Sequence, residues 1–583
     1  NKVFHLKIAH IYIEEHKAIK ALNIPINGNF ECSYNNKKLI LKKSELDLSD
    51  YYRNIDISAI IGKNGTGKTT ILDFLETLIL PSDSNGIIVF YCESKYRFYI
   101  CNINRCEIES VEIISSNNDI PVSYEHISNS AYFIKKNKIN LVNINNIPSE
   151  QAGLTLKGNR TNPHIINLSL KSYIKNQSKI REYFSKLLTY FKKYYEYEPF
   201  QEKIYFELKI GQSPVRIFNR VNYFLSERES GIDFSKEWLR NVNVRQLFKD
   251  STPFNNLIGF NALSILSHLS KSADERPENQ DVILYYFIRI FLIIKEENDM
   301  AYHNILRETV RSLDFRENWS EIIINQKINP PREMDELYNI IDFKNLGKKL
   351  ELIIEKLTVL SGLMVDHGLE YSEFKQNTFE LDDYNLINDI SNILDDLPTD
   401  LSSNVRMGWR GISTGELAFS HIFSETFHYF NDLSSYNENN IIIIDEVDLY
   451  LHPEWQREFI YKYLVLISHC QQINNIASPQ VILTTHSPII TGDFLPKDIV
   501  SLYKEIDEYD NENIVIKPSL GFGTSISDLY LTGMHLRAVF GEHSKAYIDL
   551  ILEHAKGGEL TEFDKKLIEQ ISDKHIRQYL LAL

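Results

Sequence analysis

The sequence predicts an α/β fold in which a strand-rich N-terminal region and a parallel sheet are separated along the chain by a helical insertion. The first observation is Ile55–Ile61, a buried strand pattern that leads into a glycine-rich turn and then a helix. The second is that Ile441–Ile444 and Val481–Thr484 are short and largely apolar, as in a parallel sheet covered on both faces. The third is the intervening region, where apolar residues recur at the three- and four-residue spacing of helices.

Shorter patterns fill in the remaining elements. Alternating runs such as Val3–Ile13 and Ile87–Tyr91 indicate strands, whereas Ser169–Tyr197 and Asp342–Val359 have helical periodicity. The most apolar run, Val282–Ile294, is too short to span a bilayer. It therefore predicts a buried helix, and we expect no membrane association.

The turn after the first buried strand matches the complete phosphate-binding loop pattern. Its glycines permit backbone geometry that side chains would block, so successive N–H groups can surround a polyphosphate. Lys68 is expected to reach the outer phosphates and Thr69 to bind Mg²⁺, aided by the dipole of the following helix. A chance glycine-rich turn is the alternative, but strand, loop and helix agree on a nucleoside triphosphate site. The residues expected to contact the nucleotide are Gly62, Lys63, Asn64, Gly65, Thr66, Gly67, Lys68, Thr69 and Thr70.

Two acids follow the apolar strand Ile441–Ile444. Ligands of open α/β sheets bind at the carboxyl ends of the strands, where Asp445 and Glu446 would lie. We expect Asp445 to hold Mg²⁺ and Glu446 to act as the base that orients the attacking water. An ordinary acidic turn after a strand is the alternative, and the phosphate-binding loop argues against it.

His486 follows the strand Val481–Thr484, at the same predicted edge of the sheet. A lone histidine is usually structural. At this edge, however, His486 would lie near a γ-phosphate, so we expect it to act as a switch residue.

The segment Trp409–Glu416 precedes a helical stretch, Leu417–Tyr429. Ser413 and Gly415 could present a hydroxyl and backbone N–H groups at a helix N-terminus, which is an anion site. The alternative is a simple helix cap in which Ser413 and Glu416 form a capping box. Both roles are compatible.

The ordered motifs GKNGTGKT, WRGISTGE, IIIIDEVDLYLHPEWQ and VILTTHSP resemble the ABC/SMC-like ATPase heads of the RecF, OLD and anti-phage defence type. The DLYLHPEWQ segment and the pattern of residues 521–583 look most like the PtuA family of Septu and retron systems. This resemblance implies an ABC-type head with a mixed N-terminal β lobe and a RecA-like parallel sheet. It also implies ATP and Mg²⁺ as ligands.

The same resemblance implies a role for each matched residue. Lys68, Glu446 and His486 would be catalytic, and Thr69 and Asp445 would bind the metal. Ser413, Gly415 and Glu416 would face a nucleotide held by a second subunit in a head-to-head homodimer or higher even oligomer. One departure is His452, which stands where many dimer-contact loops of such heads have aspartate; Leu-His-Pro is common in the defence-type heads.

From the change in patterns and the motifs together, we expect four parts of the chain. They are an N-terminal ATPase lobe at 1–170, a helical insertion at 171–400, a C-terminal ATPase lobe at 401–505 and a C-terminal extension at 506–583.

The resemblance supports an ATPase that dimerises around nucleotide and regulates a partner effector, an HNH nuclease resembling PtuB. A retron context would add a reverse transcriptase and its DNA–RNA product. The alternative is a RecF/SMC-like DNA-repair clamp that grips duplex DNA directly, and a third hypothesis is a nucleotide-dependent scaffold with almost no hydrolysis. We expect no intrinsic nuclease, because the segment after His486 is short for a Toprim domain and its aspartates are in the wrong order.

Charge and cysteine content add two expectations. The net charge of −16 argues against a general nucleic-acid coat, although lysines interleaved with aromatics in 171–193 suit backbone contact plus base stacking. An amphipathic helix with a solvated lysine face is the alternative for that segment. The five cysteines show no paired spacing and no secretory signal opens the chain, so we expect a reducing, cytoplasmic setting.

Overall fold

The computed structural model describes 5–46, 48–114, 121–146, 162–170, 173, 177–193, 204–208, 217, 257–297, 300–314, 339–367, 378–381, 384–402, 405–409, 413–432, 438–506, 512–533, 541–558 and 560–582. The chain forms two compact units. Unit 1 comprises 1–169 and 425–583, and unit 2 comprises 170–424.

The central sheet of unit 1 has seven strands in the order β11-β10-β15-β16-β5-β17-β18. All neighbours are parallel except β17 and β18, which form an antiparallel pair. The register places Ile443 beside Ile482, and Ile482 beside Ser58. The strands are β5 (Asp56–Gly62), β10 (Ile139–Ile144), β11 (Ile165–Asn167), β15 (Asn439–Ile444), β16 (Gln480–Thr484), β17 (Ile499–Ile506) and β18 (Glu512–Lys517).

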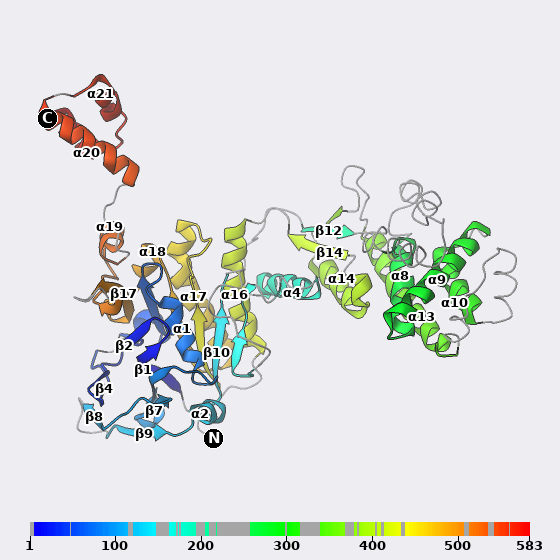
Figure 1. Cartoon of the computed structure of the whole chain (residues 1–583), viewed down its shortest axis with the longest axis horizontal. Helices are drawn as coiled ribbons and strands as arrows, with labels where there is room; N and C mark the ends of the chain where they lie inside the picture. Colours follow the sequence, from blue (N-terminus) through cyan, green and yellow to red (C-terminus); the bar gives the residue numbers. More distant parts are fainter. Residues whose placement is uncertain are drawn as a thin grey trace. The chain divides into compact units, whose positions relative to one another are not determined.

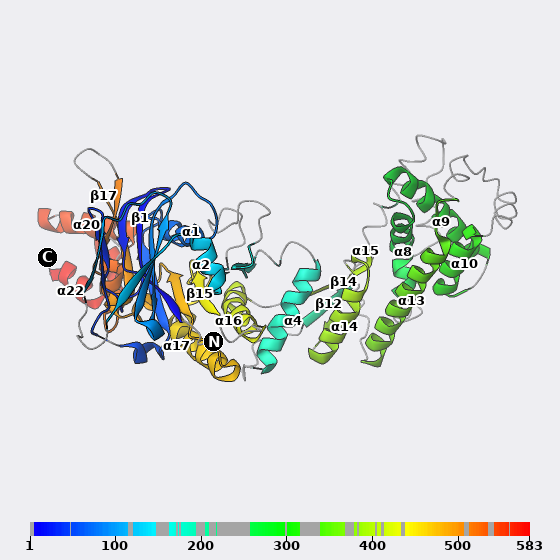
Figure 2. The same cartoon turned by 90° about the horizontal axis from the view of Figure 1, so that it is seen from below.

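A second, mostly antiparallel sheet in unit 1 has the order β2-β1-β6-β7-β9. In both views its blue strands lie beside the yellow and orange strands of the central sheet (Figures 1 and 2). Ile8 and Ile11 of β1, Ile60 of β5 and Ile71 of α1 (Lys68–Glu76) belong to one hydrophobic cluster, so the two sheets and α1 share a core. The strands are β1 (Leu6–His16), β2 (Ile19–Ile24), β6 (Asn85–Cys92), β7 (Arg97–Ile103) and β9 (Ser123–Ile127), and a small third sheet contains β3 (Ser33–Asn35), β4 (Lys38–Lys42) and β8 (Ser110–Ile114).

Helices complete unit 1 and its C-terminal region. Ile551, Ile568 and Leu580 form a small core among the last three helices. The helices are α2 (Ser130–Lys136), α17 (Pro453–Asn474), α18 (Pro488–Thr491), α19 (Ile526–Asp528), α20 (Glu542–Gly557), α21 (Glu562–Glu569) and α22 (Lys574–Ala582). The helix α16 (Thr414–Asp432) begins in unit 2 and ends in unit 1.

Unit 2 is mainly helical, as the periodicity of the insertion predicts, with one large hydrophobic cluster. The run Val282–Ile294 lies within a buried helix, as predicted. Unit 2 also contains a three-stranded antiparallel sheet that sequence analysis did not predict, in the order β13-β12-β14. The elements are α4 (Gln177–Lys193), α8 (Leu257–Ala273), α9 (Pro277–Glu297), α10 (Tyr302–Asp314), α13 (Phe343–Asp366), α14 (Tyr384–Asp396), α15 (Thr399–Ser402), β12 (Ile204–Leu208), β13 (Thr378–Leu381) and β14 (Val405–Trp409).

Most aromatic residues of α4 are buried. Tyr183, Tyr190 and Phe191 are buried, and Lys186 donates a hydrogen bond to the Tyr173 hydroxyl at 3.1 Å. Buried rings cannot stack on bases, so this helix fits the amphipathic interpretation better than a base-stacking surface. Lys171 and Lys175, which contributed to the nucleic-acid hypothesis, lie outside the described residues.

The mixed α/β fold with a parallel sheet confirms the predicted fold class. The predicted four-part division stays a prediction, although β17 and β18 continue the central sheet beyond residue 505.

Candidate functional site

The phosphate-binding loop connects β5 to α1 at the carboxyl end of the parallel strands. Gly62, Gly65 and Gly67 all have positive φ, a region that side chains disfavour. A Cβ on Gly62 would lie 2.7 Å from Thr66 Oγ1 and 2.8 Å from the Leu502 carbonyl oxygen, so no side chain fits there. The loop geometry is therefore one that only its glycines permit.

Lys68 is the first residue of α1 and its side chain is buried. Its Nζ donates hydrogen bonds to the carbonyl oxygens of Gly62, at 3.0 Å, and Lys63, at 3.3 Å, so the ammonium lies within the curve of the loop. Burial lowers the pKa of Lys68, and the nearby carboxylates Glu446 and Asp445 oppose that shift. A desolvated cation in this position is suited to an anionic ligand.

Asp445 follows β15 and reaches the start of α1. The Thr69 hydroxyl donates a hydrogen bond to Asp445 Oδ2 at 2.9 Å, joining residues from distant parts of the sequence. A carboxylate and a hydroxyl oxygen are hard ligands of the kind Mg²⁺ prefers, with phosphates and water completing its shell. These two residues therefore fit the metal, which would neutralise charge on the phosphates when bound.

Glu446, the next residue, adopts a left-handed backbone conformation with φ 49°. Its backbone N–H donates to Thr484 Oγ1 at 2.7 Å. Burial and the adjacent Asp445 raise the pKa of Glu446, and Lys68 opposes the shift. A carboxylate with a raised pKa is a better proton acceptor than an ordinary glutamate, which suits a general base.

His486 lies just beyond β16, and its backbone N–H donates to Asp448 Oδ1 at 2.9 Å. Within the described residues its ring Nε2 is buried and has no hydrogen-bond partner. Burial and the Lys68 charge lower the pKa of His486, which favours the neutral form of its ring. A neutral imidazole offers one N–H donor to a ligand at this edge.

The predicted signature residues belong to unit 2. Ser413 is exposed at the N-terminus of α16, where its backbone N–H donates to Glu416 Oε2 at 2.8 Å and its Oγ accepts from the Glu416 N–H at 3.2 Å. The predicted capping box is therefore present, and it pairs the N–H groups of Ser413 and Glu416 at this helix N-terminus. Gly415 is buried, and Gly411 and Ile412 lie outside the described residues.

Sequence reasoning missed three polar residues at this edge. Thr484 and Asp448 bond to the predicted residues, and Asn146, just beyond β10, is buried with no partner for either side-chain amide atom within the described chain. The register of β10 and β15 pairs Ile144 with Ile444, which brings Asn146 to the edge that carries Asp445. The sequence contained a signal for two of these residues. Thr484 belongs to a pair of threonines before His486, and Asn146 to a pair of asparagines at the end of a strand.

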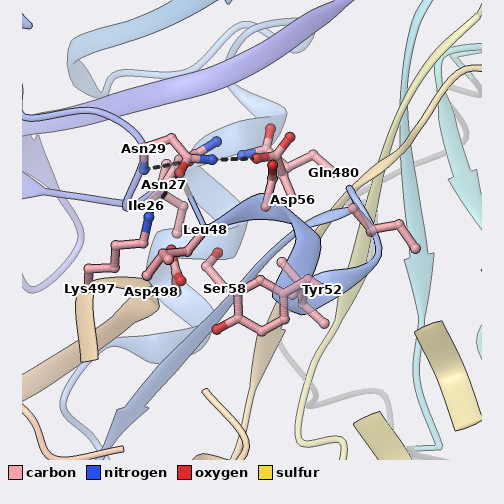
Figure 3. A pocket seen from close by; sticks show the side chains of 13 residues that line it. Ile26, Asn27, Asn29, Leu48, Tyr52, Asp56, Ser58, Gln480, Lys497 and Asp498 are labelled. Atoms are coloured by element: carbon pink, nitrogen blue, oxygen red, sulfur yellow. Dashed lines mark hydrogen bonds between the residues drawn. The ribbon is translucent and has the colours of Figure 1, made fainter. Parts of the chain in front are cut away.

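A small pocket lies at the opposite end of β5, lined by Asn27, Asp56, Ser58, Lys497 and Asp498 among others (Figure 3). Its volume of about 10 Å³ admits a water molecule and excludes a nucleotide. Asn27 Nδ2 and Ser58 Oγ, both buried, have no hydrogen-bond partner among the described residues. The pocket is therefore polar but separate from the phosphate-binding loop.

Asp498 in this pocket gives a stability prediction. Burial raises its pKa to about 6, against 3.8 for an unperturbed aspartate. The folded protein holds this proton more tightly than the unfolded chain does, so raising the pH through that interval destabilises the fold. Asp498→Asn, whose Oδ1 can still accept the Gly28 N–H, should match the wild type near pH 4 and exceed it near pH 7 by on the order of 1–3 kcal/mol. Thermal unfolding across this pH range measures the difference, and a difference independent of pH would contradict the assignment.

A glycine-rich loop, a buried lysine, a threonine–aspartate pair and a glutamate at the carboxyl edge of a parallel sheet define a P-loop nucleoside triphosphatase. The chain belongs to the AAA ATPase domain family, whose model matches residues 35–491. This membership and the relatives below confirm the resemblance to ABC/SMC-like ATPases of anti-phage defence.

Two relatives are informative. The Septu protein PtuA of Bacillus thuringiensis is 30% identical over 142 residues, which cover 24% of this chain and 30% of that protein. The Retron Vc95 probable ATPase of Vibrio cholerae serotype O1 biovar El Tor is 22% identical over 351 residues, covering 55% of this chain and 66% of that protein. The alignments thus leave more than two thirds of the first relative and about a third of the second unmatched.

Among the described helices, none is both long enough and apolar enough to cross a membrane.

Proposed function

We propose that this chain is an ATP-hydrolysing head that pairs with a second copy around bound nucleotide and regulates a partner effector in anti-phage defence. The observation that carries the proposal is the convergence of Lys68, Thr69, Asp445 and Glu446 on one edge of the sheet. Lys68 would bind the outer phosphates, and Thr69 and Asp445 would hold Mg²⁺. Glu446 would orient the attacking water and take its proton.

The pairing rests on Ser413. Ser413 is exposed at the N-terminus of α16, where the helix dipole favours an anion. Its hydroxyl proton and its N–H would bind the anion once the Glu416 carboxylate gives up its bond to that N–H. In the proposed dimer this helix end binds the γ-phosphate held by Lys68 of the other copy. Nucleotide binding would then favour association, and hydrolysis would release it.

The effector is proposed by resemblance to PtuA and to the retron ATPase. An HNH nuclease resembling PtuB is the first candidate, and a retron setting would add a reverse transcriptase and its DNA–RNA product. The alternative DNA clamp predicts tight duplex binding with steep salt dependence. The buried aromatics of α4 and the net charge of −16 give it less support.

Ser413→Asp tests the pairing without removing the helix cap. Aspartate caps helices as well as serine does, but its charge would repel the γ-phosphate. We expect the wild type to associate in the presence of Mg²⁺ and a non-hydrolysable ATP analogue, and Ser413→Asp to stay monomeric, as measured by light scattering.

The matched control is Ser525→Asp, at another exposed helix N-cap, which should associate like the wild type. Equal association of Ser413→Asp and the wild type would refute the proposed contact. A wild-type chain that neither associates nor hydrolyses ATP would refute the proposed function as a whole.

A further inference from the structure

The ends of β15 and β16 are tied together by a residue to which the nucleotide chemistry above assigns no role. Thr484 is the last residue of β16, fully buried, beside the segment that follows β15. Its hydroxyl donates to Asp445 Oδ1 at 2.5 Å and accepts from the Glu446 N–H at 2.7 Å. Its carbonyl oxygen accepts from the Val447 N–H at 3.0 Å.

These three bonds support the backbone at Glu446, which has an unfavourable conformation. Glu446 has φ 49°, a conformation uncommon for residues with side chains, and persistent conformations of this kind need support from their surroundings. The Thr484 hydroxyl is a suitable support because it donates and accepts at once. It satisfies the N–H of Glu446 and an oxygen of the preceding carboxylate with one oxygen atom.

Asp445 is consequently held from two sides. Thr69 from α1 bonds Oδ2 and Thr484 from β16 bonds Oδ1, so the orientation of this carboxylate is fixed by two hydroxyls from different elements. Asp445 is itself buried, which makes each of these bonds costly to lose. Because Thr484 bonds Oδ1, the other carboxylate oxygen of Asp445, Oδ2, faces Thr69 and would face the metal.

We propose that Thr484 is a positioning residue, which orients the Asp445 carboxylate toward Mg²⁺ and holds the Glu446 backbone in its left-handed conformation. The inference rests on the proposed function, since it concerns the same metal and the same base. Thr484 itself touches neither nucleotide nor metal in this account.

The test is Thr484→Val, which replaces the hydroxyl by a methyl group of similar size. Loss of a supporting hydrogen bond to a metal ligand typically lowers metal affinity or activity by about 10–100-fold. We expect the Mg²⁺ concentration that half-saturates hydrolysis to rise by about that factor and kcat to fall. ATP binding without Mg²⁺, which Lys68 and the loop would provide, should change little. Thr484→Ser, which keeps the hydroxyl, should restore the Mg²⁺ midpoint.

A matched control is Thr309→Val, a buried threonine in α10 whose hydroxyl donates to the Ile305 carbonyl oxygen, at 2.7 Å. It should leave the Mg²⁺ midpoint unchanged. If Thr484→Val does not fold, Thr484→Ala can replace it. Alanine also lacks the hydroxyl but places no methyl group next to the Asp445 carboxylate, and we expect the same rise in the Mg²⁺ midpoint.

An unchanged Mg²⁺ midpoint in a folded Thr484→Val or Thr484→Ala protein would overturn the proposal. So would a midpoint that Thr484→Ser fails to restore. These outcomes are distinct from failure of the proposed function, in which the wild type itself would show no Mg²⁺-dependent hydrolysis.

Discussion

Lys68→Ala is expected to reduce ATP hydrolysis by about 10²–10³-fold, as removal of one preorganised donor that stabilises transition-state charge does. The Lys68 ammonium is already buried within the phosphate-binding loop, so it would not have to be desolvated when the phosphates arrive. Nucleotide affinity should fall with it, because the charge contacts the phosphates before and during reaction. Steady-state hydrolysis and fluorescent-nucleotide titration measure the two effects.

Loss of the fold should not explain that result. Burial lowers the pKa of Lys68, which means that the folded state holds its proton less tightly than the unfolded chain and that the charged lysine costs stability at neutral pH. A thermal melt of Lys68→Ala beside the wild type shows whether the fold is kept. Lys7→Ala is the control: Lys7 pairs with Asp56 at the other end of β5, and its loss should leave hydrolysis intact. Near-normal hydrolysis by Lys68→Ala would refute the site.

The sequence identified the parts of this site that depend on neighbouring residues. A strand pattern followed by the glycine-rich loop placed Lys68 and Thr69, and an apolar run ending in acids placed Asp445 and Glu446 at a sheet edge. Because carboxyl ends of parallel strands share one edge, these residues could be expected to meet.

What the sequence did not predict depends on strand order and on distant pairing. Thr484 contacts Asp445 only because β16 is inserted between β5 and β15, which no local pattern determines. Likewise, β12 pairs with two strands that are distant in the sequence, because Ile204 lies opposite Leu381, 177 residues away, and Trp409, 205 residues away. The helical periodicity around β12 gave no sign of this small sheet. The contact proposed for Ser413 involves a second copy, and one chain's sequence contains no geometry for it.

Glu446→Gln is expected to separate binding from hydrolysis. Glutamine has the size of glutamate but cannot accept the proton of the attacking water, so hydrolysis should fall by about 10²–10⁴-fold. The backbone N–H that bonds Thr484 Oγ1 is unchanged, and Lys68, Thr69 and Asp445 are intact. Mg²⁺-dependent nucleotide affinity should therefore stay within a few-fold of the wild-type value.

The variant should also accumulate the nucleotide-bound dimer, because the proposed release step follows hydrolysis. Light scattering with ATP and Mg²⁺ should show more dimer for Glu446→Gln than for the wild type. Glu458→Gln is the control: Glu458 is on α17 and pairs with Lys462, so its change should affect neither hydrolysis nor association. No gain in dimer would argue against the nucleotide sandwich even if hydrolysis were lost.

The pH dependence tests the same residue by an independent route. Burial and Asp445 raise the pKa of Glu446, so its carboxylate takes up a proton at a higher pH than an ordinary glutamate does. A base must be deprotonated to act, so wild-type kcat/KM, which reports the free protein, should fall as the pH is lowered, with the midpoint above the usual glutamate range. The small residual hydrolysis by Glu446→Gln should show no such midpoint in its pH dependence. A wild-type profile that persists in Glu446→Gln would assign the titration, and the base, to another group.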